Sequence, residues 1–124
     1  TIPCADGSYD AATLNNVLHH VPRSARVDLM REIRRAVAGP VYIKDHLTTG
    51  LVDDLRLTAL DAWGNIPFGG MVKADYLSRR DWEALARAAG YQISAVASSR
   101  KYRSGLAGLA FPNRLETTMR FEPG

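Results

Sequence analysis

Cysteine, aromatic residues and long apolar runs are all scarce in this chain of 124 residues. Its one cysteine, Cys4, excludes an internal disulfide and a cysteine-rich zinc site, and this usage is typical of a reducing compartment such as the cytoplasm. No apolar run approaches the roughly 18 residues that a transmembrane helix needs, and the first residues lack the layout of a signal peptide. We therefore expect a soluble, cytoplasmic protein with no membrane partner.

The charge balance offers little support for a nucleic-acid partner. The chain has 16 Lys and Arg residues against 13 Asp and Glu residues, so the net charge is +3 although the pI is near 9.3. Most of the basic residues alternate with acidic ones, and we interpret the run at residues 100–103 and the three arginines of residues 31–35 as solvated surface. With 46% hydrophobic residues and this length, the composition predicts one folded domain spanning residues 1–124.

The first part of the chain has the pattern of a strand, a helix and a second strand. Residues 9–14, from Tyr9 to Leu14, form a short and mostly apolar stretch. A helix with apolar residues at helical spacing follows from Ser24, its expected N-cap, until Gly39 and Pro40 end it. Residues 41–43 then form an apolar strand, which turns polar at residues 44–46. The right-handed crossover of such a unit brings the carboxyl ends of both strands to one edge, where open α/β sheets bind ligands.

The remainder predicts two more helices and two more strands. An apolar stripe from Leu51 to Trp63 indicates a helix that ends at Gly64. The residues 78–81 have the form of a capping box, opening a helix that buries Trp82 and stops at Gly90. Residues 91–99 and the alternating residues 115–122 form strands, which the turn at residues 105–113 joins as a long hairpin. The expected fold is α/β, with a partial Rossmann-like sheet of about four strands and flanking helices.

The run of residues 8–21, Ser-Tyr-Asp-Ala-Ala-Thr-Leu-Asn-Asn-Val-Leu-His-His-Val, resembles the fourth-strand motif of class I S-adenosylmethionine-dependent methyltransferases that act on small molecules. The helix and strand that follow match that family in type and spacing, as do residues 61–65 and 76–82. The resemblance implies a sheet whose last strand is antiparallel. It covers nearly the whole chain, from the family's fourth strand onward.

One part of the family pattern is missing from this sequence. None of the ten glycines belongs to a Gly-x-Gly motif after a strand, which in the family cradles the cofactor. The chain therefore resembles the C-terminal half of a methyltransferase, and we expect it to bind the cofactor poorly by itself. The strand at residues 9–14 is then an open sheet edge, and we expect it to pair with a second copy of the chain or with an N-terminal half.

The resemblance implies roles for residues at the expected ligand edge. Asn15, Asn16, Val17 and His20 correspond to positions that bind S-adenosylmethionine, although two asparagines at a strand end can also cap the next turn. His20, His46 and Asp45 are the catalytic candidates, because an imidazole titrates near neutral pH and can act as a base. Asp45 can orient His46 or the acceptor, or can offset Lys44.

Two further sets of residues complete the expected site. Trp63, Phe68 and Tyr76 lie in the segment that shapes the acceptor pocket in the family, although such residues are also common in plain cores. Cys4, His19, His20, Asp45 and His46 carry atoms that can ligate a metal, but their spacing matches no known metal motif, and we expect no metal.

The sequence thus predicts a methyltransferase that uses S-adenosylmethionine on a small molecule. Methyl transfer is a direct displacement at a sulfonium carbon, so the protein chiefly aligns the acceptor and the methyl group. The alternative is a catalytically silent module of methyltransferase-like fold that assembles with a partner through its open sheet edge.

Overall fold

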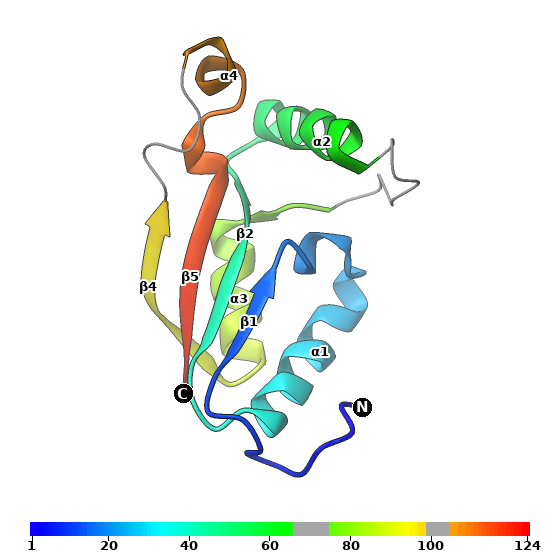
Figure 1. Cartoon of the computed structure of the whole chain (residues 1–124), viewed down its shortest axis with the longest axis vertical. Helices are drawn as coiled ribbons and strands as arrows, with labels where there is room; N and C mark the ends of the chain where they lie inside the picture. The colour runs from blue at the N-terminus through cyan, green and yellow to red at the C-terminus, as the bar shows by residue number, and fades with distance from the viewer. Residues whose placement is uncertain (66–74, 99–104) are drawn as a thin grey trace.

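An open, mixed sheet organises the molecule (Figure 1). The computed structural model describes residues 1–65, 75–98 and 105–124. Strands β1 (Ala12–Asn15), β2 (Val41–Thr48), β5 (Glu116–Pro123) and β4 (Tyr91–Ser98) lie side by side in that order, and the short β3 (Leu77–Ser78) pairs with the end of β2. β1 and β2 are parallel, whereas β5 is antiparallel to both of its neighbours. The predicted α/β class and the antiparallel last strand are confirmed.

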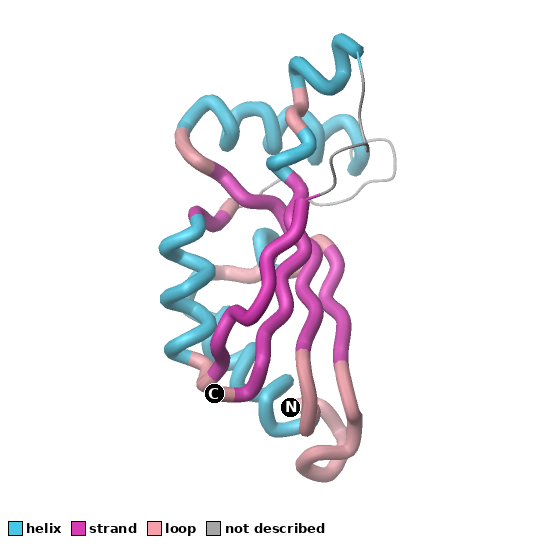
Figure 2. The backbone as a smooth tube through the Cα atoms, turned by 90° about the vertical axis from the view of Figure 1, so that its left-hand side faces the viewer, coloured by secondary structure: helices cyan, strands magenta, loops and turns pink. Residues whose placement is uncertain are grey.

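Two helices cover one face of this sheet, and two others lie beyond one end of it. Figures 1 and 2 show α1 (Arg23–Ala36) and α3 (Arg79–Ala88) along the sheet, with α2 (Leu51–Asn65) and α4 (Gly105–Ala110) past the carboxyl end of β2. Met30, Ile33, Trp82 and Phe121 belong to the main core between the sheet and the first pair of helices. No helix in the described part of the chain is long and apolar enough to cross a membrane.

The first strand is shorter at its start than the sequence pattern suggests. β1 begins at Ala12 rather than Tyr9, which makes only an isolated bridge with Val37. Because Pro40 has no backbone N–H to donate, the regular parallel ladder starts only where Ala12 lies opposite Val41. The strand is at the edge of the sheet, as predicted.

Two further boundaries differ from the prediction. Ser24 is not the N-cap, because α1 begins at Arg23 after Pro22, whose fixed φ suits a helix start and whose side chain makes no capping hydrogen bond. The second strand was predicted to end in residues 44–46, but β2 continues two residues further, to Thr48. The pairing with β3 explains this extension, since Leu47 and Thr48 lie opposite Leu77 and Ser78.

The capping box before α3 is confirmed. The Ser78 backbone N–H donates to Asp81 Oδ2 at 2.9 Å, and the Asp81 N–H donates back to Ser78 Oγ at 3.3 Å. The helix buries Trp82 as expected, and β4 follows directly. Residues 105–113 are more structured than the predicted turn, because they contain α4 and the start of the 3₁₀ helix η3 (Asn113–Leu115).

The close approach of two loops depends on a glycine. An ideal Cβ built on Gly39 would lie 2.1 Å from the carbonyl oxygen of Asp10, which is a fixed backbone atom. We predict that Gly39→Ala lowers the free energy of unfolding by at least about 2 kcal/mol, because the backbone has to move. Gly64→Ala is the matched control, since a Cβ at that helical position meets nothing within 4 Å. Equal urea midpoints for the two variants would contradict this prediction.

Candidate functional site

The loop after β1 begins with a special backbone conformation. Asn16 adopts φ = 53°, a left-handed geometry that asparagine tolerates better than most residues. Its N–H donates to the Lys44 carbonyl at 2.7 Å, so the turn is tied to β2. The chain then enters the 3₁₀ helix η1 (Leu18–His20). Asn15, Asn16 and Val17 are exposed at this edge of the sheet, as a ligand-binding role requires.

Asp45 is the buried centre of the site. Its side chain is 1% exposed and accepts three hydrogen bonds, from His19 Nδ1 at 2.5 Å, the Leu18 N–H at 3.0 Å and the His46 N–H at 2.7 Å. A buried carboxylate is tolerated only when such donors replace water. Since a carboxylate only accepts, the His19 contact places a proton on Nδ1 of that ring. Asp45 therefore fixes the loop after β1 to the interior of β2.

The side chain that Asp45 binds is one that the sequence analysis left out of the catalytic candidates. Asp45 contacts the ring of His19, and it also accepts a hydrogen bond from the His46 backbone N–H. The sequence does not indicate which of the adjacent residues His19 and His20 has its side chain buried. The 3₁₀ turn decides this, because it buries His19 to 1% exposure and leaves His20 half-buried.

Four aromatic rings pack together around this carboxylate. The His19 ring centroid lies 4.1 Å from that of His20, 5.0 Å from that of His46 and 5.4 Å from that of Tyr76. Tyr76 meets His46 edge-on at 5.7 Å, and it joins Leu57 and Leu115 in a second small core. The structure thus brings the predicted residues His20, Asp45, His46 and Tyr76 to one place.

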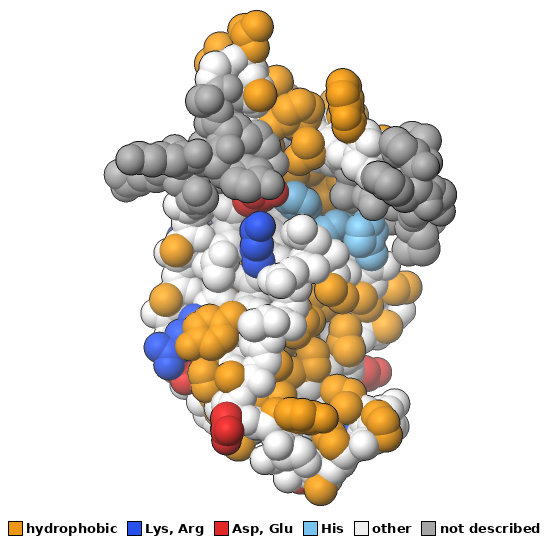
Figure 3. All heavy atoms as spheres, in the orientation of Figure 1, with side chains coloured by type: hydrophobic (Ala, Val, Ile, Leu, Met, Phe, Trp, Pro, Cys, Tyr) orange, Lys and Arg blue, Asp and Glu red, His pale blue; other side chains and the backbone are white. Residues whose placement is uncertain are grey.

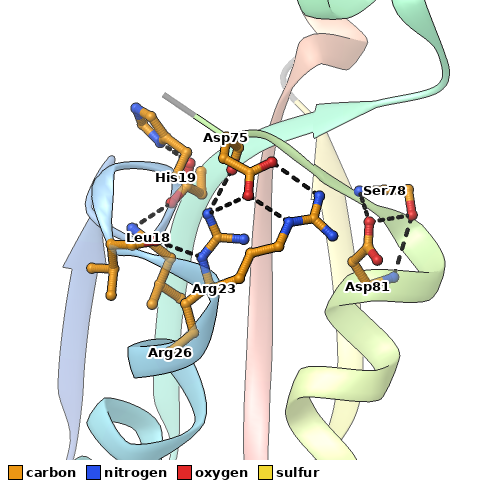
Figure 4. Close-up of polar contacts among 9 residues, drawn as sticks. Leu18, His19, Arg23, Arg26, Asp75, Ser78 and Asp81 are labelled. Carbon is orange, nitrogen blue, oxygen red and sulfur yellow. Dashed lines mark hydrogen bonds and ion pairs between the residues drawn. The ribbon is translucent and has the colours of Figure 1, made fainter. Parts of the chain in front are cut away.

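A polar clamp, comprising Arg23, Arg26 and Asp75, joins the segment before β3 to the loop after β1 and the start of α1 (Figure 4). The Asp75 N–H donates to the His19 carbonyl at 2.8 Å, and Arg23 binds the Asp75 carboxylate with two hydrogen bonds, at 2.5 and 2.9 Å. Buried Arg26 donates to the carbonyls of Val21 at 2.8 Å and Asp75 at 2.7 Å. The Arg23 hydrogen bonds lower the pKa of Asp75, whereas burial lowers the pKa of Arg26. These residues are far apart in the sequence, so the clamp forms only when the chain folds.

Of the predicted acceptor residues that the structure describes, Tyr76 belongs to this cluster and Trp63 does not. Trp63 is 86% exposed on α2, and Phe68 is outside the described residues. Cys4 is partly buried near Arg35, whose guanidinium donates to its carbonyl at 2.9 Å. In the described ranges, no group of three or more His, Cys, Asp and Glu side chains is arranged to hold a metal ion.

Comparisons with known proteins agree with this architecture. Residues 1–39 match the family model described as a methyltransferase domain. The fold matches geranyl diphosphate C-methyltransferase from Streptomyces coelicolor A3(2), with a TM-score of 0.70 and 11% identity over 100% of this chain and 51% of that one. It also matches a methyltransferase from Methanosarcina mazei, with a TM-score of 0.66 and 15% identity over 99% of this chain and 63% of that one.

A further match is magnesium protoporphyrin IX methyltransferase from Synechocystis PCC 6803, with a TM-score of 0.58 and 16% identity over 95% of this chain and 46% of that one. The chain thus spans about half the length of several solved structures that it matches. No curated protein matches its sequence. The family model and the shared fold confirm the resemblance to the class I methyltransferases.

The buried carboxylate gives a direct test of this site. We predict that Asp45→Asn lowers the free energy of unfolding by about 3 kcal/mol, because an amide NH₂ would face donors that now bind a carboxylate. Asp28→Asn is the control, since that side chain is 81% exposed and its ion pair with Arg31 spans 3.7 Å. Urea unfolding followed by circular dichroism measures both. If Asp45→Asn lowered the free energy of unfolding no more than Asp28→Asn does, the central role of Asp45 would be contradicted.

Proposed function

We propose that this chain is the part of an S-adenosylmethionine-dependent methyltransferase that contributes to the cofactor and acceptor sites for a small molecule. The observation that carries the proposal is the loop from Asn15 to His20, which presents two exposed amide side chains while Asp45 fixes its base. The family match over residues 1–39 contains this whole loop. Among the solved matches, geranyl diphosphate C-methyltransferase is an example of a small-molecule enzyme with this fold.

The side chains of the loop fit the amino-acid part of the cofactor. An asparagine amide can donate to a carboxylate and accept from an ammonium group, and both groups occur in S-adenosylmethionine. We assign this binding to Asn15, Asn16 and the backbone at Val17, with His20 beside them. The cofactor would supply a methyl group on a sulfonium sulfur. The residues of this chain would bind the cofactor and align the acceptor.

The interior residues of the site support different roles. His46 and His20 remain our candidates for the base, which matters for an acceptor that must lose a proton. Asp45 is a positioning residue in this proposal, because it acts through the His19 ring and the His46 backbone rather than on the acceptor. Tyr76 packs on His19 and His46 and shapes the wall toward the acceptor.

Replacement of Asn16 tests the cofactor assignment. Asn16→Gly keeps the left-handed backbone accessible and removes only the amide. We predict that the affinity of the chain for S-adenosylhomocysteine falls about tenfold, which corresponds to one lost hydrogen bond to a charged group. Amide chemical shifts in an NMR titration detect even weak binding. Gln92→Ala, which removes an exposed amide on β4, is the control. An affinity that stays the same in both variants would remove Asn16 from the site.

The alternative function is supported by the position of β1 at the sheet edge. A strand with unpaired backbone groups on one side is a template for another strand. We propose that this edge pairs with a second copy of the chain or with an N-terminal half of the enzyme. Pairing with no binding of S-adenosylhomocysteine would favour the catalytically silent module over the enzyme.

A proline at position 13 can block this edge selectively. The Ala12 N–H donates to the carbonyl of Pro40, just before β2, and the Asn16 N–H donates to that of Lys44 on β2. The alternation of a strand therefore places the Thr13 N–H on the opposite, outer side. We predict that the chain self-associates at high concentration and that Thr13→Pro keeps it monomeric with little change in melting temperature. Analytical ultracentrifugation measures the mass. A folded wild-type monomer at every concentration would contradict self-pairing through β1.

A further inference from the structure

A groove lies between helix α3 and strand β4, at the edge of the sheet opposite to β1. Its volume is about 660 Å³, and the buried side chains of Trp82, Ala86 and Met119 form its floor. Ile93 and Val96 of β4 also line it, and Val96 is 49% exposed. The described residues that line the groove include none from the loop after β1, the aromatic cluster around Asp45 or the polar clamp. The groove is therefore separate from the proposed site.

The outer edge of β4 carries backbone groups that no strand of the described chain pairs with. β4 is the last strand in the sheet order, and Figures 1 and 3 show it at the left-hand surface of the molecule, with isolated hydrophobic side chains over it. An unpaired edge is a template for an additional strand, and a groove beside it can receive alternate side chains of that strand.

The pairing with β5 shows which backbone groups are free. The Gly124 N–H donates to the Gly90 carbonyl at 2.9 Å, so every second residue of β5, counted back from Gly124, directs its N–H and C=O toward β4. Met119 is an odd number of residues from Gly124, so its groups point toward β2 instead. Since Val96 lies opposite Met119, the Val96 N–H and C=O point to the outer edge of the sheet.

A bulge in β4 favours a flexible peptide over a second copy of the chain. The register with β5 shifts between Ile93 and Ala95, which leaves Ser94 as the extra residue. A bulge bends an edge strand, and this is one way in which proteins prevent their edges from pairing with those of other folded molecules. A flexible peptide can follow the bend, because its backbone is not held by a fold of its own.

The charges at the groove favour an acidic occupant. Among the described residues that line it, only Arg79, Glu83 and Arg87 are charged. Arg79 Nε donates to Glu83 Oε1 at 3.1 Å, whereas the exposed Arg87 guanidinium has no hydrogen bond or ion pair within the described part of the chain. The two stretches outside the described ranges, 66–74 and 99–104, contain basic residues but no acidic one. A carboxylate of the occupant can therefore pair with Arg87.

We propose that the groove between α3 and β4 binds an extended, acidic peptide of a partner protein, which adds a strand to β4 and places alternate apolar side chains on the floor of the groove. The free backbone groups of β4 select an extended chain, since a small apolar molecule would leave them unpaired. The inference goes beyond the proposed function, because no residue assigned to the cofactor or to the acceptor takes part.

Selection from a displayed peptide library tests this inference without a chosen partner. Random peptides of eight residues, the length of β4, are selected against the immobilised 124-residue chain. The expected result is enrichment of peptides in which apolar and polar residues alternate and an Asp or Glu is present. Enrichment of basic peptides, enrichment without alternation, or no enrichment would overturn the inference.

Two pairs of variants then locate the most enriched peptide. Val96→Pro removes the outward N–H at an edge position that tolerates proline, and it should weaken binding at least about tenfold because strand pairing is interrupted. Val96→Ala is the matched control, since it shortens the side chain and keeps the N–H. Arg87→Gln should weaken binding about threefold at low salt, and Arg80→Gln, on the same helix but outside the groove, is its control.

Circular dichroism confirms that each variant is folded. Equal affinities of Val96→Pro and Val96→Ala would contradict strand addition, and equal affinities of the two arginine variants would contradict an acidic partner. A dimer that Val96→Pro abolishes and Thr13→Pro retains would also overturn the inference, because a second copy would then occupy β4. Binding of S-adenosylhomocysteine is measured separately, so its absence would contradict the proposed function and not the peptide groove.

Discussion

The buried carboxylate of Asp45 is the constraint on which the site depends. A charge with 1% of its surface exposed needs donors to replace the lost water, and three are present. Two of them, the Leu18 N–H and the His19 ring, belong to the loop after β1. The carboxylate thus holds the inward-facing His19 ring and the first residue of the 3₁₀ helix against β2. Together with the Asn16 N–H that donates to the Lys44 carbonyl, these hydrogen bonds fix the loop to β2.

The layers around Asp45 extend this constraint outward. His19 and His46 pack on Tyr76, and the Asp75 N–H is bound to the His19 carbonyl. Tyr76 in turn packs with Leu57, which anchors α2. A continuous set of contacts therefore runs from the interior of β2 to the helix that lies past the end of the sheet. The interior of the site is densely packed, whereas the amide side chains of Asn15 and Asn16 on the loop face solvent and can meet a ligand.

Local patterns were sufficient to predict most of the fold. Alternating and helical periodicities identified the βαβ unit, and the residues 78–81 identified a helix start that the structure confirms in both of its hydrogen bonds. The predicted start of β1 was wrong because it depends on the missing N–H of Pro40, which comes just before the opposite strand and is distant from β1 in the sequence. The apolar stripe from Leu51 to Trp63 predicted the helix correctly. It did not predict that these side chains are exposed, because periodicity identifies an apolar face but not whether another element covers it.

The candidate site was predicted in its location and only partly in its contacts. The rule that parallel strands end at one edge brought His20, Asp45 and His46 together correctly. The partner of Asp45 was not predictable, because His19 and His20 are equivalent in the sequence and only the turn separates them. The clamp of Arg23, Arg26 and Asp75 joins segments about fifty residues apart, and no local pattern carries such a pairing.

The central claim is that the loop after β1 receives the cofactor at the carboxyl edge of the sheet. Hydrogen–deuterium exchange of the chain, with and without saturating S-adenosylhomocysteine, tests this claim most directly. The account predicts slower exchange confined to the peptide that contains residues 15–20, with α1 and β4 unchanged. Protection elsewhere with none in this loop, or no protection at millimolar ligand, would contradict it.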